Sequence, residues 1–228
     1  MIKPLLVFSN AYDMPQVKEA LKEIPCDQLH LDFFKYPLNY EHGQKFFLEH
    51  KEYTHYLVQS PDLIPQKDDY LKMIHILQEW DYDVYGPCAN VDTKDWKNHI
   101  IACNKLPELS YENRRYRWVS ESQRQYYLEH TINTIKTKFN GLAFAFIKRE
   151  LLEQIKFTSL PYPTDERPLW EAKGGYACDL AFMHWMDYLK KEVIVDLRFK
   201  WVHNRYGSEL LVGKREPKIT FIPYDTST

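Results

Sequence analysis

Apolar and polar positions divide the first 90 residues into alternating segments of two kinds. Short apolar runs of the type found in strands covered on both faces are separated by stretches in which apolar residues recur at helical spacing. The predicted strands are Pro4–Ser9, Gln28–Phe33, Thr54–Val58 and Asp83–Gly86, and the predicted helices are Asp13–Ile24 (capped by Asp13), Gly43–Lys51 and Gln66–Trp80. This alternation predicts right-handed crossovers and a parallel, Rossmann-like sheet in the first half of the chain.

The second half is less regular. Asp92–Tyr127 is polar and basic without clear periodicity, and Thr158–Gly175 holds three Pro and two Gly, which predicts a long loop of the kind that is usually functional. Between and after these segments we expect strands near the sheet edge at Thr131–Lys138 and Leu142–Ile147, helices at Lys148–Ile155 and Ala177–Lys191, and a strand at Glu192–Leu197. The absence of linkers and repeats predicts a single domain of α/β class.

Composition narrows the class of protein. The 228 residues carry 30 basic and 32 acidic side chains, a net charge of −2 that argues against a nucleic-acid-binding partner. No window approaches the roughly 20 apolar residues of a membrane span, and the first apolar run is too short for a signal peptide. The four Cys are widely spaced, which is typical of free thiols. We therefore expect a cytoplasmic protein, with peripheral membrane contact through Arg114, Arg115 and Arg117 left open.

The segment from Tyr53 to Pro65 carries the most informative chemistry. A predicted strand is broken by Ser60-Pro61, and Asp62 follows where the chain must leave the sheet. Open parallel sheets bind ligands just beyond the carboxyl ends of their strands. We expect Asp62 to be exposed there and able to hold a metal ion and, through it, a phosphate; the alternative is that Asp62 caps the following helix.

Taken in order, these segments resemble a GT-A glycosyltransferase from Leu5 to His203, with a Rossmann-type mixed sheet flanked by helices. Ser9-Asn10-Ala11 follows the first strand, and Ser60-Pro61-Asp62 stands where the family carries Asp-x-Asp. Asn140-Gly141 before Leu142–Arg149 is similar to the glycine-led strand beside the donor sugar. A Gly-Gly segment leading to Asp179 at a helix start, with His203 after a later strand, is similar to the family's acidic helix start and late metal-binding His.

The resemblance implies a nucleotide-binding half at about 1–90, an acceptor half at about 91–205 and a C-terminal tail at 206–228. It implies Mn²⁺ or Mg²⁺ held by Asp62 and His203 on the diphosphate of a nucleotide-sugar donor, and Asp179 as general base for an inverting transfer. The acceptor would be a sugar, a lipid-linked molecule or a protein. The residues implied on the donor side are Asn10, Tyr12, Asp32, Ser60, Asp62, Asn140 and Gly141.

Two departures keep alternatives open. Ser60 replaces the first Asp of Asp-x-Asp, and Cys178 stands where many inverting members carry Glu. Asp32 and Asp179 can equally be ordinary charges at the ends of a strand and a helix, and His203 a structural histidine. A non-catalytic binding protein of the same fold therefore remains an alternative. So does a sugar-phosphate nucleotidyltransferase, although its Gly-rich, basic loop is missing after the first strand.

Overall fold

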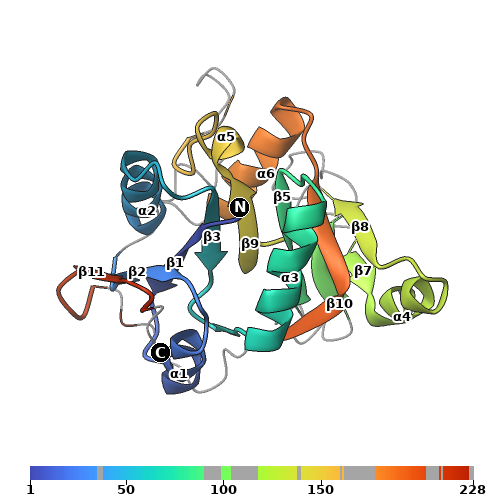
Figure 1. Ribbon diagram of the computed structural model, residues 1–228, viewed down its shortest axis with the longest axis horizontal. Helices are drawn as coiled ribbons and strands as arrows, with labels where there is room; N and C mark the ends of the chain where they lie inside the picture. Colours follow the sequence, from blue (N-terminus) through green and yellow to red (C-terminus); the bar gives the residue numbers. More distant parts are fainter. Residues whose placement is uncertain are drawn as a thin grey trace.

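The structure is a computed structural model that describes residues 1–34, 38–89, 99–103, 118–137, 140–159, 161, 178–203, 211 and 213–225 (Figure 1). Its strands are β1 (Pro4–Asn10), β2 (Asp27–Asp32), β3 (His55–Gln59), β4 (Leu63–Ile64), β5 (Val84–Ala89), β6 (His99–Cys103), β7 (Trp118–Ser120), β8 (Thr134–Thr137), β9 (Phe144–Lys148), β10 (Val193–His203) and β11 (Lys218–Ile222). Its helices are α1 (Pro15–Lys22), α2 (Leu38–Glu49), α3 (Lys67–Glu79), α4 (Glu121–Glu129), α5 (Arg149–Leu152) and α6 (Cys178–Tyr188).

Nine of these strands form one mixed sheet in the order β11-β2-β1-β3-β9-β5-β10-β4, with β8 also paired to β10. β2, β1 and β3 are mutually parallel, and β10 is parallel to β5. β9 is antiparallel to both β3 and β5, so those five strands all run in one direction. The predicted α/β class and mixed sheet are confirmed.

The place of β9 corrects a prediction. We expected the Leu142–Ile147 region near the sheet edge, but β9 lies in the middle, between β3 and β5. Phe144, Ala145, Phe146 and Ile147 are all buried, because a central strand is covered on both faces. An uninterrupted apolar run is the pattern that such a central position requires.

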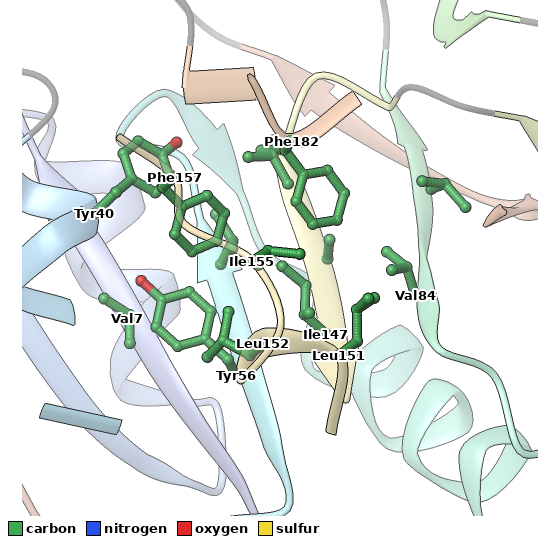
Figure 2. Packing of buried hydrophobic residues seen from close by; sticks show 14 of the residues in the cluster. Val7, Tyr40, Tyr56, Val84, Ile147, Leu151, Leu152, Ile155, Phe157 and Phe182 are labelled. Carbon is green, nitrogen blue, oxygen red and sulfur yellow. The ribbon is translucent and has the colours of Figure 1, made fainter. Parts of the chain in front are cut away.

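Two apolar clusters cover the two faces of the sheet. α1 and α3 contribute Val17, Leu21, Tyr70 and Met73 to one cluster, which also contains Phe8. The other cluster is built from α2, α5 and α6 on the opposite face. Figure 2 shows part of this second cluster, in which the rings of Tyr40 and Tyr56 lie 5.0 and 5.8 Å from that of Phe157.

The start of α1 also differs from the prediction. Its N-cap is Met14, in an extended conformation and without a side-chain cap, rather than Asp13. Pro15 is the first helical residue, and proline disfavours a helical conformation at the residue before it. Asp13 instead forms a 2.6 Å ion pair with Lys18.

The predicted tail contains a strand that the sequence did not reveal. β11 pairs antiparallel with β2 and forms the end of the sheet, at the left of Figure 1. Just before it, the backbone N–H of Leu211 donates to the carbonyl of Ala11 at 3.0 Å, so this segment crosses the end of β1. Among the described residues, no helix is long and apolar enough to cross a membrane.

Candidate functional site

The carboxyl ends of β1, β2, β3, β5 and β10 lie at one edge of the sheet, because these strands share a direction. Asn10 and Asp32 end β1 and β2 in register with each other. The Asn10 amide donates from Nδ2 to the Asp32 carboxylate, and the backbone N–H of Phe33 donates to the Asn10 carbonyl at 3.0 Å. The structure thus brings together two of the predicted nucleotide-binding residues.

His30 lies two residues before Asp32 and packs edge-on against Phe8 at 5.2 Å. Burial lowers its pKa below the usual value, while the nearby charge of Asp32 opposes that shift. The lowered pKa keeps this imidazole neutral at pH 7. The negative charge of Asp32 therefore is not cancelled by His30.

Asp62 is fully buried, which contradicts the expected exposure. The chain does not leave the sheet after Asp62 but forms β4, which pairs with β10 and encloses the turn. The Ser60 hydroxyl donates to Asp62 Oδ1. The N-cap of α3 is Gln66, so Asp62 does not cap that helix, and this alternative is wrong.

His203 lies beside this turn. In the antiparallel pairing of β4 with β10, the Cα of His203 is opposite that of Leu63, the residue that follows Asp62. The two predicted metal-binding residues are 141 positions apart in the sequence, but Asp62 directly precedes β4 and His203 ends the strand paired with it. The His203 side chain lies outside the described part of the structure.

Asn140 and Gly141 form the turn that leads into β9, beside the turn that carries Asp62. Asn140 is buried and accepts a 3.2 Å hydrogen bond at Oδ1 from the Leu142 N–H. Gly141 has a φ of 72°, a left-handed conformation that glycine adopts without strain. The Ser60 N–H donates to the Ala143 carbonyl at 2.8 Å, which ties this turn to the end of β3.

Buried polar atoms without a hydrogen-bond partner in the described protein gather at this edge. They are Asn10 Oδ1, Gln59 Oε1 and Asn140 Nδ2, together with Oδ1 of Asn39 in the first turn of α2, the helix that follows β2. Each such atom costs on the order of 1–3 kcal/mol unless something else binds it. Asn10 Oδ1 can accept a hydrogen bond and Asn140 Nδ2 can donate one, which suits a polar ligand that has both N–H or O–H groups and free oxygens.

For the two remaining predicted site residues, Tyr12 and Asp179, the structure gives less information about their position relative to this edge. Tyr12 is partly buried against the cluster on the α1 and α3 face. Asp179 is the second residue of α6, and its side chain lies outside the described part. No group of three or more potential metal-binding His, Cys, Asp or Glu side chains occurs among the described residues; that set does not include the His203 imidazole.

Arg215 in the predicted tail lies near the ends of β1 and β2. Its guanidinium is 5.0 Å from the centre of the Phe33 ring and 3.6 Å from Asp13. The structure shows Arg215 half-exposed beside the residue that follows Asp32.

Gln59 was missed by the sequence reasoning. It ends β3, is fully buried, and its Nε2 donates to the carbonyls of Ser60 and Leu63 at 2.6 and 2.7 Å. The available signal was a glutamine at the last position of the apolar run His55–Gln59. A carboxamide in a doubly covered strand needs a polar partner.

Comparison with known proteins gives a fold likeness and nothing more specific. No family model matches the chain, and no curated protein matches it. Among solved structures, the chain is similar to the crystal structure of A197 from STIV, with a TM-score of 0.51 and 19% sequence identity over 98% of this chain and 95% of that one. At this identity the likeness shows the fold alone.

Proposed function

We propose that the protein is a metal-dependent glycosyltransferase that binds a nucleotide-diphosphate sugar at the carboxyl edge of its sheet. The observation that carries the proposal is the coincidence, at one edge, of the buried Asp62 carboxylate, the adjacent backbone of His203 and the unsatisfied amide atoms of Asn10 and Asn140. The resemblance in sequence order named these residues independently of their arrangement in space.

The residues present fit a hard divalent cation. Asp62 and His203 would hold it, since Mn²⁺ accepts carboxylate oxygen and imidazole nitrogen, and the other positions are open to phosphate oxygens and water. Bound there, Mn²⁺ or Mg²⁺ would neutralise charge that develops on the leaving diphosphate. The Ser60 hydroxyl orients the Asp62 carboxylate by donating to one of its oxygens.

The amides of Asn10 and Asn140 would hold the donor. Asn10 Oδ1 accepts an N–H of the base or a ribose hydroxyl, while its Nδ2 stays on Asp32. Asn140 Nδ2 donates to an oxygen of the phosphate or the sugar, while its Oδ1 stays on the backbone of Leu142. Because each amide is fixed at one end within the protein, its free end is oriented before the ligand arrives.

Asp179 is the proposed general base. Only Leu189–Glu192 separate α6 from β10, and α6 packs Phe182 and Met186 against the sheet. A helix joined so closely to the amino end of a strand runs back over the sheet, and 11 residues extend it about 16 Å toward the carboxyl edge. This connectivity supports a place for Asp179 near that edge, where its carboxylate would take the proton of the acceptor hydroxyl.

Calorimetric titration of UDP-sugars and GDP-sugars, with and without Mn²⁺, tests the proposal. We expect weak binding without Mn²⁺ that becomes tighter when Mn²⁺ is present, slow hydrolysis of the bound donor, and loss of the metal-dependent part of the affinity in Asp62→Asn, whose amide cannot supply an anionic ligand. Asp81→Asn is the control, because Asp81 is exposed and pairs with Lys148, the last residue of the antiparallel β9, at the opposite edge of the sheet. Equal affinity with and without Mn²⁺ in the wild type would refute the metal-dependent account.

One observation favours a second candidate, a nucleotide-sugar-binding protein without turnover. Where the resemblance calls for a first Asp, Ser60 supplies only a hydroxyl, and that hydroxyl is used on Asp62. A cation held by fewer charges binds more weakly. Donor binding without any hydrolysis or transfer in the same titration would select this candidate.

A further inference from the structure

The turn that carries Asp62 is held by an unusual side chain. Gln59 is fully buried at the end of β3, and its Nε2 spans the Ser60–Leu63 turn by donating to the carbonyls at its two ends, at 2.6 and 2.7 Å. From the other side, the Ser60 N–H donates to Ala143 at 2.8 Å. These bonds fix both ends of the four-residue turn around Asp62.

The bond to Leu63 connects Gln59 to the second predicted metal-binding residue. Leu63 is the β4 residue whose Cα lies opposite His203 in the pairing with β10. A two-residue strand has little pairing energy of its own, so its register depends on what anchors its ends. Gln59 is one such anchor, and it therefore links the position of Asp62 to that of His203.

Gln59 differs from the other buried glutamines that hold backbone carbonyls. Gln44 donates to Leu152 and Ile155 at 3.0 and 2.7 Å, and Gln28 donates to Leu21 while its Oε1 meets His30. Neither of these two glutamines has a buried side-chain atom without a partner among the described residues. In Gln59, by contrast, the buried Oε1 has no hydrogen-bond partner there. The two hydrogen bonds that Gln59 Nε2 donates offset the cost of this unpartnered oxygen.

We infer that Gln59 is a positioning residue. Its carboxamide holds the Ser60–Leu63 turn in the position in which Asp62 and His203 can bind one divalent cation. The inference rests on the function proposed above and adds a residue that its chemistry did not include. Outer-shell hydrogen bonds of this kind typically change metal affinity by about 10–100-fold when removed. Gln59 itself does not touch the cation.

The test is Mn²⁺ binding by Gln59→Met, followed as the loss of the electron paramagnetic resonance signal of the free ion, with Mn²⁺ alone and with UDP or GDP present. Met fills a similar volume and donates nothing. We expect the Mn²⁺ dissociation constant to rise about tenfold or more. Nucleotide affinity without metal should stay within about twofold, because Asn10 and Asn140 do not bond to Gln59.

Gln44→Met is the matched control, since it removes two equivalent hydrogen bonds from a buried glutamine of α2. It should lose a comparable amount of stability in a denaturant titration and keep wild-type Mn²⁺ affinity. If both variants weaken Mn²⁺ binding alike, or if Gln59→Met leaves it within twofold, the positioning role is overturned. Should Gln59→Met fold poorly, Gln59→Asn keeps the amide but is one methylene short of spanning both carbonyls, and the same weakening is expected.

Asp62→Asn in the same titration separates this inference from the proposed function. If the wild type and Asp62→Asn bind Mn²⁺ equally, the metal site itself is wrong, whatever Gln59 does. If Asp62→Asn loses the ion while Gln59→Met keeps it, the site stands and only the positioning role fails.

Discussion

The buried Asn10 amide has one end held within the protein and one end without a partner among the described residues. Its Nδ2 is committed to Asp32, and that bond fixes which end of the amide carries the free oxygen. Asn140 has the same division, with its Oδ1 committed to the backbone and its Nδ2 without a partner in the described protein. Such half-satisfied amides cost stability, which is expected where a ligand completes them.

The residue types at this edge were predictable from the sequence, but their burial was not. Asp62 was expected to be exposed, because a carboxylate after a strand usually meets solvent. It is buried because a two-residue strand, too short to recognise in a sequence, pairs with the end of β10. Gln59 was overlooked for a related reason: its role depends on carbonyls that only the folded turn brings within reach.

At the same scale, Asp179→Asn tests the proposed base. Asparagine keeps the size of the side chain but cannot accept the proton of the acceptor hydroxyl. We expect the rate of sugar transfer to fall by about 100-fold or more, with donor affinity within about twofold of the wild type.

Asp187→Asn, in the last turn of the same helix, is the control and should leave the rate unchanged. Single-turnover kinetics with a saturating donor measure the chemical step directly. A near-normal rate in Asp179→Asn would remove this residue as the base, and a retaining transfer would then have to be considered.

At the scale of elements, strands with continuous apolar runs were predicted well. β1, β3 and α1 lie within two residues of their predicted ranges, because their pattern is local, whereas α2 begins at Leu38 and not at the predicted Gly43. β11 was missed because an edge strand exposed to solvent has no such run: Ile219, Phe221 and Ile222 are each more than 40% exposed. Its pairing with β2 is a long-range contact that no local pattern encodes.

The contact of β5 with β9 gives an element-scale prediction. A Cβ added at Gly86 would overlap the backbone carbonyl oxygen of Phe144, the first residue of β9. Both strands are central and cannot move apart freely, so we expect Gly86→Ala to lower the free energy of unfolding by about 1–3 kcal/mol, measured by urea denaturation.

Gly43→Ala in α2 provides the comparison. There a Cβ would meet side chains, with Val7 Cγ1 at 2.7 Å, and these can shift more easily than a backbone carbonyl. Alanine also gains about 1 kcal/mol of helix propensity over glycine. We expect a smaller loss than in Gly86→Ala, and the reverse order would show that the two central strands are not packed as described.

At the scale of the whole molecule, the sheet explains why residues far apart in sequence meet. Five strands share a direction, so their carboxyl ends form one edge, and the antiparallel β9 starts at that same edge. Asn10, Asp32, Gln59, Asn140 and His203 therefore come to one side of the molecule from both halves of the chain. The sequence predicted that such an edge would exist. It did not predict that β9 lies between β3 and β5, because this pairing joins strands that are far apart in the sequence.

The most direct test of the proposed metal site is to map which residues lie close to bound Mn²⁺. In ¹⁵N-labelled protein with bound nucleotide, Mn²⁺ broadens the amide resonances of nearby residues, and diamagnetic Mg²⁺ serves as the reference. The account predicts that the amides of Ser60, Asp62, Asn140 and His203 broaden first and together, ahead of those of remote residues such as Lys22. Broadening that spares the amides of Asp62 and His203, or that centres on another surface, would contradict it.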